Sequence, residues 1–230
     1  MKKLFLYTFL LCIIGTATGQ ENKTLQGSFI HREADKNVLW LFIDGYCSVT
    51  HFKNNEYIAT MGGPFTYSEA NGITIQVEYN DDDKQMIGTS LTTNIHYNDE
   101  ALILEGKKIL KKTNNNKQDL DGLWRITGRM ENEKLATIPR ADRKTIKILV
   151  DGYFQWIAIN PATKGFYGTG GGTYTFANGK YTENILFFSR DNHRVGAQLS
   201  FKGSLENGEW QHSGKSSKGD DIYEIWSKDN

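Results

Sequence analysis

Seven aromatic, acidic and imidazole side chains in the second half of the chain have the types and spacing of a binding pocket. In a β-strand, residues two positions apart point to the same face. The candidate residues recur in this way within short segments that alternate between apolar and polar residues. The candidate ligand-binding residues are Trp156, Tyr181, Glu183, Trp210, His212, Glu224 and Trp226.

Three kinds of chemistry fit these residues. Aromatic rings supply contact area, and a few carboxylate or imidazole groups fix the orientation of a small ligand. Glu183, His212 and Glu224 could instead perform acid–base catalysis, as in a hydrolase or isomerase, or belong to an incomplete metal site. A structural alternative pairs the two glutamates with Arg125, Arg194 or a lysine near the rim of a barrel.

The ligand-binding interpretation is the one that the pattern favours. The sequence contains no His-Glu-x-x-His motif or comparable metal-ligand spacing. A mixed group of two carboxylates and one histidine is also not diagnostic of an active site. We therefore expect a binding protein rather than an enzyme, and we assign no catalytic residue, metal ligand or cofactor.

The elements that position these residues belong to a repeat. Asp44-Gly45-Tyr46 returns as Asp151-Gly152-Tyr153 at an offset of 107 residues, and Gly88 returns as Gly196 at an offset of 108. A period near 100 residues is about the size of one small domain and is too long for a solenoid unit. The chain is therefore expected to contain two copies of one module.

Both modules read as β-structure. Two-residue alternation recurs between Gly, Asn and Asp turn residues, whereas helical periodicity is almost absent. Asn178-Gly179 is a strong signal for a two-residue hairpin, because both positions need positive φ. Consecutive short strands joined by hairpins can close on themselves. We predict an all-β fold of two tandem up-and-down antiparallel β-barrels with about eight strands each.

The predicted divisions follow the composition. Residues 1–19 form a signal peptide, 20–112 the first module, 113–119 a polar linker and 120–230 the second module. Lys2 and Lys3 precede the apolar run from Leu4 to Ile14, and a small-residue site predicts cleavage after Gly19. The protein is expected to be secreted or periplasmic, with no membrane span after signal cleavage.

Charge and cysteine content narrow the function further. The chain has 27 basic and 27 acidic residues, a formal net charge of +0, so no strong basic field attracts nucleic acid. Of the 2 cysteines, Cys12 lies in the signal peptide, which leaves Cys47 without a disulfide partner. The repeat places Phe154 at the position of Cys47, so we expect a buried structural thiol.

Two irregular stretches carry further expectations. A phosphate-binding glycine loop leads from a strand into a helix, but the run from Gly168 to Gly172 leads into strand residues. It therefore predicts a sharp strand bend or a close approach of an aromatic ring to the backbone. The segment from Arg129 to Arg143 is expected to be the longest irregular loop, lying near a barrel mouth.

The start of each module resembles a known family. Gly122-Leu123-Trp124 is similar to the Gly-x-Trp signature of lipocalin-like (calycin) proteins, and Gly27-Ser28-Phe29 repeats it with Phe for Trp. The resemblance implies that the ring plugs the closed end of the barrel beneath a basic residue from the last strand. Lys228 or Lys111 would occupy that place.

A longer stretch resembles the uncharacterised secreted lipocalin-like domains of bacterial genomes (the DUF4488 type). It comprises Asp151 to Trp156, Gly168 to Tyr174 and Glu224 to Trp226, and the resemblance extends over essentially all of the second module and more dimly over the first. It implies a barrel and an extracytoplasmic address, and it supplies no activity. The modules are short for lipocalins and lack the disulfide typical of that family.

Three functions remain open from the sequence. The leading one is a secreted lipocalin-like binding protein that holds a small apolar or amphipathic ligand in the second module. The first alternative is an extracytoplasmic protein- or carbohydrate-interaction module that uses exposed rings and has no internal cavity. The third is a hydrolase or isomerase at the barrel mouth. The first module is plainer, with Leu102 and Leu104 near the places of Trp210 and His212.

Overall fold

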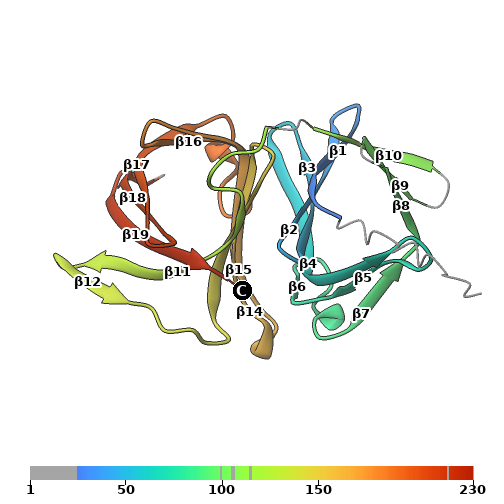
Figure 1. Ribbon diagram of the computed structural model, residues 1–230, viewed down its shortest axis with the longest axis horizontal. Coiled ribbons are helices and arrows are strands. Elements are labelled where there is room, and N and C mark those ends of the chain that lie inside the picture. The colour runs from blue at the N-terminus through green and yellow to red at the C-terminus, as the bar shows by residue number, and fades with distance from the viewer. Residues whose placement is uncertain (1–24, 99, 105–106, 114–115, 217, 230) are drawn as a thin grey trace, which may run out of the picture.

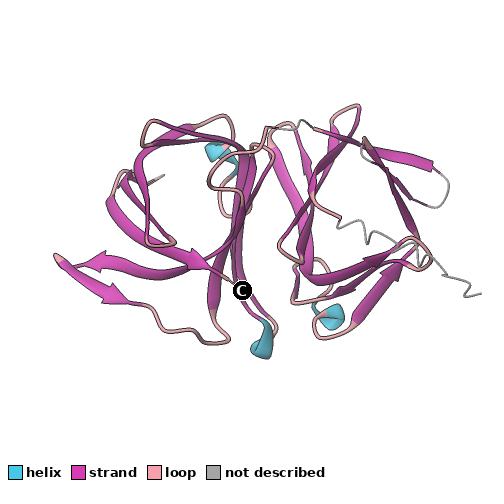
Figure 2. Ribbon diagram, in the orientation of Figure 1, coloured by secondary structure: helices cyan, strands magenta, loops and turns pink. Residues whose placement is uncertain are grey.

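The protein consists of two β-barrels that lie side by side, with the C-terminus between them (Figure 1). The computed structural model describes residues 25–98, 100–104, 107–113, 116–216 and 218–229. The predicted signal peptide, residues 1–19, lies outside the described residues. Strands and three short 3₁₀ turns make up the regular structure of the described residues, with no α-helix (Figure 2). The predicted all-β fold is confirmed.

The first barrel is a sheet with the strand order β7-β5-β4-β3-β2-β1-β10-β9-β8, and β6 pairs with β4. This sheet is nearly closed. Its strands are β1 (Gly27–Glu33), β2 (Lys36–Ile43), β3 (Tyr46–Lys53), β4 (Glu56–Ser68), β5 (Gly72–Gln76), β6 (Tyr79–Asn80), β7 (Ser90–Thr93), β8 (Ile95–Asn98), β9 (Ala101–Leu104) and β10 (Lys107–Lys112).

The second barrel is closed, because its first strand pairs with its last, β11 with β19. The remaining neighbours follow chain order, which is the expected up-and-down meander. Its strands are β11 (Gly122–Glu131), β12 (Lys134–Thr137), β13 (Lys144–Val150), β14 (Tyr153–Asn160), β15 (Gly165–Ala177), β16 (Lys180–Phe188), β17 (Gln198–Glu206), β18 (Glu209–Lys215) and β19 (Asp221–Lys228).

The hairpin turn predicted at Asn178-Gly179 forms, and a turn of the same kind forms at Asp151-Gly152. Asn178 and Gly179 have φ values of 52° and 71°, and Asp151 and Gly152 have 51° and 78°. Both pairs lie in the positive-φ region that a two-residue hairpin turn requires and that L-residues with longer side chains avoid. These turns set the register of the strands that carry the candidate site.

The prediction that Arg129 to Arg143 is an irregular loop is wrong for its first half. β11 continues to Glu131 and forms a hairpin with β12, through a turn in which Asn132 and Glu133 have positive φ. Pairing with β12 supplies hydrogen-bond partners to the extended backbone of β11. An irregular loop would have to find such partners elsewhere. In Figure 1 this hairpin projects away from the second barrel.

The glycine run lies inside a strand, whereas the sequence predicted that it only leads into one. β15 begins at Gly165 and contains the whole run from Gly168 to Gly172. A Cβ atom at Gly170 would lie 2.7 Å from Nε1 of Trp156, and one at Gly171 would lie 2.5 Å from the ring of Phe187. The glycines therefore allow aromatic rings to lie against the backbone.

The two barrels pack through the outer faces of β2, β3, β13 and β14, with approximate two-fold symmetry. Ser48 donates a hydrogen bond of 2.6 Å to Gln155, and these residues occupy the same position of the repeat, 107 residues apart. Asp44 accepts from the backbone of Leu123 at 2.9 Å, and Asp151 accepts from the backbone of Ser28 at 3.1 Å. Each barrel therefore presents the same surface to the other, as in an isologous dimer interface.

Candidate functional site

A cavity of about 760 Å³ occupies the mouth of the second barrel. Five of the seven predicted site residues line it, namely Trp156, Glu183, His212, Glu224 and Trp226. The other two, Tyr181 and Trp210, are fully buried in the adjoining aromatic core. All seven therefore lie around the cavity or in the aromatic core that adjoins it.

The closed end of the second barrel is filled by its own side chains. Trp124 is buried, donates a hydrogen bond of 2.8 Å to the carbonyl of Leu120, and makes an edge contact with Trp210 at 5.9 Å between ring centroids. Nζ of Lys228 lies 4.3 Å from the centroid of the Trp124 ring. A basic residue of the last strand thus covers the plug, as the family resemblance implied for Lys228.

The corresponding expectation for Lys111 is wrong. Lys112, not Lys111, is the residue opposite Phe29, as Lys228 is opposite Trp124. Lys111 is opposite Ile30 and is exposed. The sequence match was off by one residue, and in a strand a shift of one residue moves a side chain to the other face.

Lys147 lies at the base of the cavity, and the sequence reasoning missed it. Its ammonium is buried, lies 3.1 Å from Oε1 of Glu183, and stands 4.9 Å from the centroid of Trp226 and 5.0 Å from that of Trp210. A carboxylate and aromatic faces are the partners that stabilise a desolvated cation. Lys147 therefore occupies an internal aromatic cage.

Glu183 is held between two donors. Tyr181 donates a hydrogen bond of 2.8 Å to Oε1 of Glu183, the same oxygen that Lys147 approaches. Burial, followed by the charge of Glu183, raises the pKa of Tyr181 well above its usual value. Tyr181 consequently keeps its proton and remains a hydrogen-bond donor to Glu183.

A second polar pair, His212 and Glu224, lies on the neighbouring strands β18 and β19. Nε2 of His212 is 3.1 Å from Oε2 of Glu224, and Nε1 of Trp226 donates to the same oxygen at 3.1 Å. Burial lowers the pKa of His212 below its usual value, and the charge of Lys147 acts in the same direction. At neutral pH the imidazole is therefore uncharged.

Glu224 has a lowered pKa although burial alone would raise it. Its contact with His212 and the nearby charge of Lys147 outweigh that burial. Glu224 is therefore ionised at neutral pH. Both ring nitrogens of His212 and Nε1 of Trp210 are buried and form no hydrogen bond of regular geometry among the described residues, although Nε2 of His212 lies close to Glu224.

The structural alternative paired the two glutamates with Arg125, Arg194 or a lysine near the rim, and the structure pairs Glu183 with a lysine, Lys147, but neither glutamate with an arginine. Arg125 lies 3.8 Å from Asp229, and Arg194 lies 3.2 Å from Asp191. The glutamates instead pair with Lys147 and His212 inside the barrel. For catalysis, Glu183, His212 and Glu224 would have to converge, but only His212 and Glu224 are in mutual contact, while Glu183 binds Lys147 and Tyr181.

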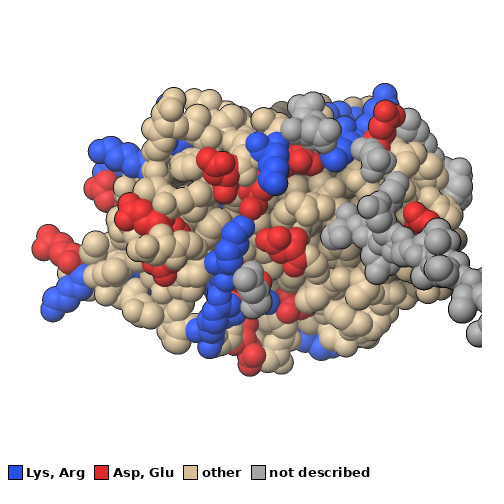
Figure 3. Space-filling view, in the orientation of Figure 1, with Lys and Arg blue, Asp and Glu red and all other residues tan. Residues whose placement is uncertain are grey.

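The wall of the cavity is apolar and its rim is charged. The wall is lined by Ile185, Phe188, Leu199, Phe201 and Ile222. The rim carries Arg129, Arg190, Arg194 and Lys218 beside Asp191 and Asp220. Basic and acidic side chains are also interspersed over the face of the molecule in Figure 3.

Several other functional expectations can be compared with the structure. The rings of the candidate site lie inside the barrel or at its cavity, so they form no exposed patch of the kind that the interaction-surface alternative requires. Among the described residues, no group of three or more His, Cys, Asp or Glu is placed to hold a metal ion. Cys47 is buried, as expected, and burial raises the pKa of its thiol to about 12.

No model of a known protein family matches this chain, and a search of curated proteins finds no match either. Within the part of the chain that the structure describes, no helix combines the length and the apolar character needed to cross a bilayer.

Proposed function

We propose that the protein is a binding protein that holds a small amphipathic molecule in the mouth of the second barrel. The observation that carries this proposal is the cavity of about 760 Å³, which combines an apolar wall with buried polar groups at its base. Its volume is in the range of about 300–1,000 Å³ that small-molecule sites occupy.

The two parts of the cavity suit the two parts of an amphipathic ligand. Ile185, Leu199 and Ile222 offer apolar contact to the body of the ligand. The ligand's polar group faces the polar pairs at the base, Lys147 with Glu183 and His212 with Glu224. A few polar groups in a mainly apolar pocket fix the orientation of a ligand.

The filled end of the barrel limits the ligand's length. Trp124, Tyr181 and Trp210 are each no more than 2% exposed and occupy the space that a long acyl chain would need. The ligand is therefore compact, closer to a ring system than to an extended lipid. The lipocalin-like resemblance supports a barrel that binds within its mouth and does not specify the ligand.

The proposed address is outside the cytoplasm. It rests on the basic, apolar and small-residue order of residues 1–19 and on the family resemblance. Its test is expression of the full chain with residues 1–19 intact, followed by N-terminal sequencing of the exported product. A mature protein that begins at Gln20 supports export and cleavage, whereas a product that retains Met1 contradicts them.

The binding proposal is tested by titrating the chain from Gln20 to Asn230 with anilinonaphthalene sulfonate, an amphipathic fluorescent probe. We expect saturable binding with a blue-shifted emission, competed by a compact amphipathic ligand. Leu199→Trp, which fills the cavity wall, should weaken binding by roughly tenfold or more.

The matched control is Leu91→Trp in the first barrel. Leu91 is opposite Ile75 as Leu199 is opposite Glu183, so the control adds the same ring at the equivalent position. We expect it to leave probe binding unchanged. Absence of saturable binding, or equal effects of the two substitutions, would contradict a site in the second barrel.

A further inference from the structure

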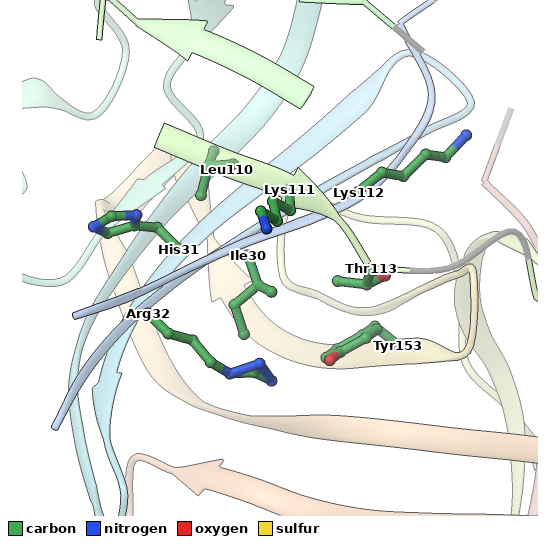
Figure 4. A pocket seen from close by; sticks show the side chains of 8 residues that line it. All are labelled: Ile30, His31, Arg32, Leu110, Lys111, Lys112, Thr113 and Tyr153. Atoms are coloured by element: carbon green, nitrogen blue, oxygen red, sulfur yellow. The ribbon is translucent and has the colours of Figure 1, made fainter. Parts of the chain in front are cut away.

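A second, separate groove lies between the two barrels, on the side where β1 and β10 face the start of β14 (Figure 4). Its volume is about 440 Å³. Its lining residues are Ile30, His31, Arg32, Leu110, Lys111, Lys112, Thr113 and Tyr153. Tyr153 belongs to the second barrel and the others precede it, so the groove exists only where the barrels meet.

The groove has an excess of positive charge. Arg32, Lys111 and Lys112 line it, together with His31, and no carboxylate is among its lining residues. Arg32 and Lys111 are exposed and form no ion pair within the described part of the chain. His31 lies 3.9 Å from Glu33, and Lys112 lies close enough to Asp151 for its charge to oppose the rise that burial causes in the pKa of that carboxyl. Two of the cations therefore remain uncompensated.

Neutral groups of the groove add hydrogen-bonding capacity and an apolar surface. The Tyr153 hydroxyl forms no hydrogen bond with any described residue, and Figure 4 shows the Tyr153 ring near Thr113 and Ile30. Ile30 is only 9% exposed and belongs to the apolar cluster between the barrels. A bound molecule can thus place an anionic group against the cations and an apolar part against Ile30.

The symmetry-related place on the second barrel shows how such a groove is filled. The backbone N–H of Thr113 donates to Ser28 at 3.0 Å, and that of Asp229 donates to Leu123 at 3.0 Å, so Thr113 and Asp229 are equivalent. The Asp229 carboxylate accepts a hydrogen bond from Arg140 and lies 3.8 Å from Arg125. The second barrel therefore supplies an anion for its own cations.

Among the described residues, the first barrel has no carboxylate at the position of Asp229 and no segment like the one that carries Arg140. Arg140 belongs to the segment between β12 and β13, whereas β1 and β2 of the first barrel are joined by a tight turn at Ala34 and Asp35. Thr113 replaces the carboxylate of Asp229. By strand pairing Ile30 is equivalent to Arg125 and Lys111 to Ser227, so the cations of the groove are particular to the first barrel, and Thr113 offers them no carboxylate like that of Asp229.

We propose that this groove binds a small molecule through an oxyanion, either a carboxylate, a phosphate or a sulfate. Arg32 and Lys111 supply the charge, because guanidinium and ammonium groups are strong donors to oxyanions. The Tyr153 hydroxyl donates a further hydrogen bond from the second barrel. This site is independent of the cavity in the second barrel.

The test is an NMR titration of the chain from Gln20 to Asn230 with sodium acetate, phosphate and sulfate in separate arms. Sodium chloride holds the ionic strength constant, because screening alone changes surface electrostatics. We expect saturable amide shifts confined to residues near 30–32, 110–113 and 153 in at least one arm. The arm with the tightest binding identifies the oxyanion.

Two variants decide whether the groove is responsible. Arg32→Ala with Lys111→Ala should weaken binding by about tenfold or more, and Tyr153→Phe by about threefold to tenfold. Lys36→Ala with Lys84→Ala removes the same charge from exposed positions of the first barrel and should leave binding unchanged. Linear shifts in every arm, or equal losses in both double variants, would overturn the proposal.

Discussion

The two barrels share one strand pattern, yet their interiors differ in polarity at equivalent positions. Trp40 is opposite Phe29 in the first barrel, as Lys147 is opposite Trp124 in the second. In the same way Ile75 corresponds to Glu183 and Leu104 to His212, by their pairing with the neighbouring strands. The first barrel thus has apolar residues at the positions of Lys147, Glu183 and His212.

This difference indicates that the polar groups are not needed to form the barrel. A buried ion pair often stabilises a fold no better than apolar residues of similar size, because desolvation offsets the attraction. The first barrel demonstrates the apolar solution within the same chain. The second barrel therefore carries its polar base at a cost in stability, as binding sites commonly do.

The largest change in stability is expected from Glu183→Leu, which leaves Lys147 as a buried cation without its carboxylate. We expect the second barrel to lose about 3–5 kcal/mol of unfolding free energy. Urea unfolding followed by tryptophan fluorescence measures this loss, because four of the five tryptophans lie in the second barrel.

The double variant Lys147→Met with Glu183→Leu gives the second barrel an apolar base like that of the first. It should recover most of the stability that Glu183→Leu loses. Probe binding should nevertheless stay weak in the double variant. If Glu183→Leu alone were as stable as the unchanged protein, the burial of Lys147 would not depend on its ion pair with Glu183.

The interface provides a second comparison, because Ser48 and Gln155 occupy equivalent positions but have different lengths. Gln155 accepts from Ser48 at 2.6 Å and donates to Thr60 at 3.1 Å and Thr169 at 3.0 Å. Gln155→Leu removes one hydrogen-bond partner from each of these buried hydroxyls, so we expect a loss of about 1–3 kcal/mol.

Thermal or urea unfolding measures this loss, with Gln76→Leu as the matched control. Gln76 is exposed and bonds only to Ser90, so its replacement should change stability by no more than about 0.5 kcal/mol. If Gln155→Leu behaved like this control, the hydrogen-bonded network between the barrels would contribute nothing measurable.

The pH dependence of stability should differ between the two barrels, because the second has His212 where the first has Leu104. Burial lowers the folded-state pKa of His212, so the unfolded chain binds a proton first as pH falls below about 6.5. Stability is therefore full above that pH and declines below it, by about 1.4 kcal/mol for each pH unit in which only the unfolded state is protonated. Urea unfolding at a series of pH values measures this slope.

His212→Leu, which copies Leu104 of the first barrel, should flatten the slope between about pH 6.5 and pH 5. His51 in the first barrel also has a pKa lowered by burial, so a smaller slope of the same sign remains. An unchanged slope in His212→Leu would contradict the buried, neutral state of His212.

The sequence predicted the parts of the site that lie on strands with one solvent-facing side. Tyr181 and Glu183 alternate with partly exposed Thr182 and Asn184, so the two-residue period was visible. Lys147 was missed because β13 is buried on both sides. Ile146 and Ile148 face the first barrel while Lys147 faces the cavity, and a lysine within such an apolar run gives no periodic signal.

The interface between the barrels and the groove beside it could not be predicted from strand patterns. Both depend on how two separately closed sheets pack, which the alternation within one strand does not encode. The offset of 107 residues did identify Ser48 and Gln155 as equivalent. It could not show that these equivalent residues contact each other across the symmetry axis.

The smallest expected difference concerns the plugs at the closed ends. Lys228 covers the ring of Trp124 and donates to the carbonyl of Asp121 at 2.9 Å, whereas Lys112 is opposite the smaller ring of Phe29. Lys228→Met should cost about 0.5–1 kcal/mol through loss of the cation–π contact, because Trp is the strongest ring partner. Lys112→Met should cost less, since no such contact forms with Phe29 in the described structure. Urea midpoints of the two variants measure the difference. A larger loss from Lys112→Met would contradict the greater contribution of the lysine–ring contact in the second barrel.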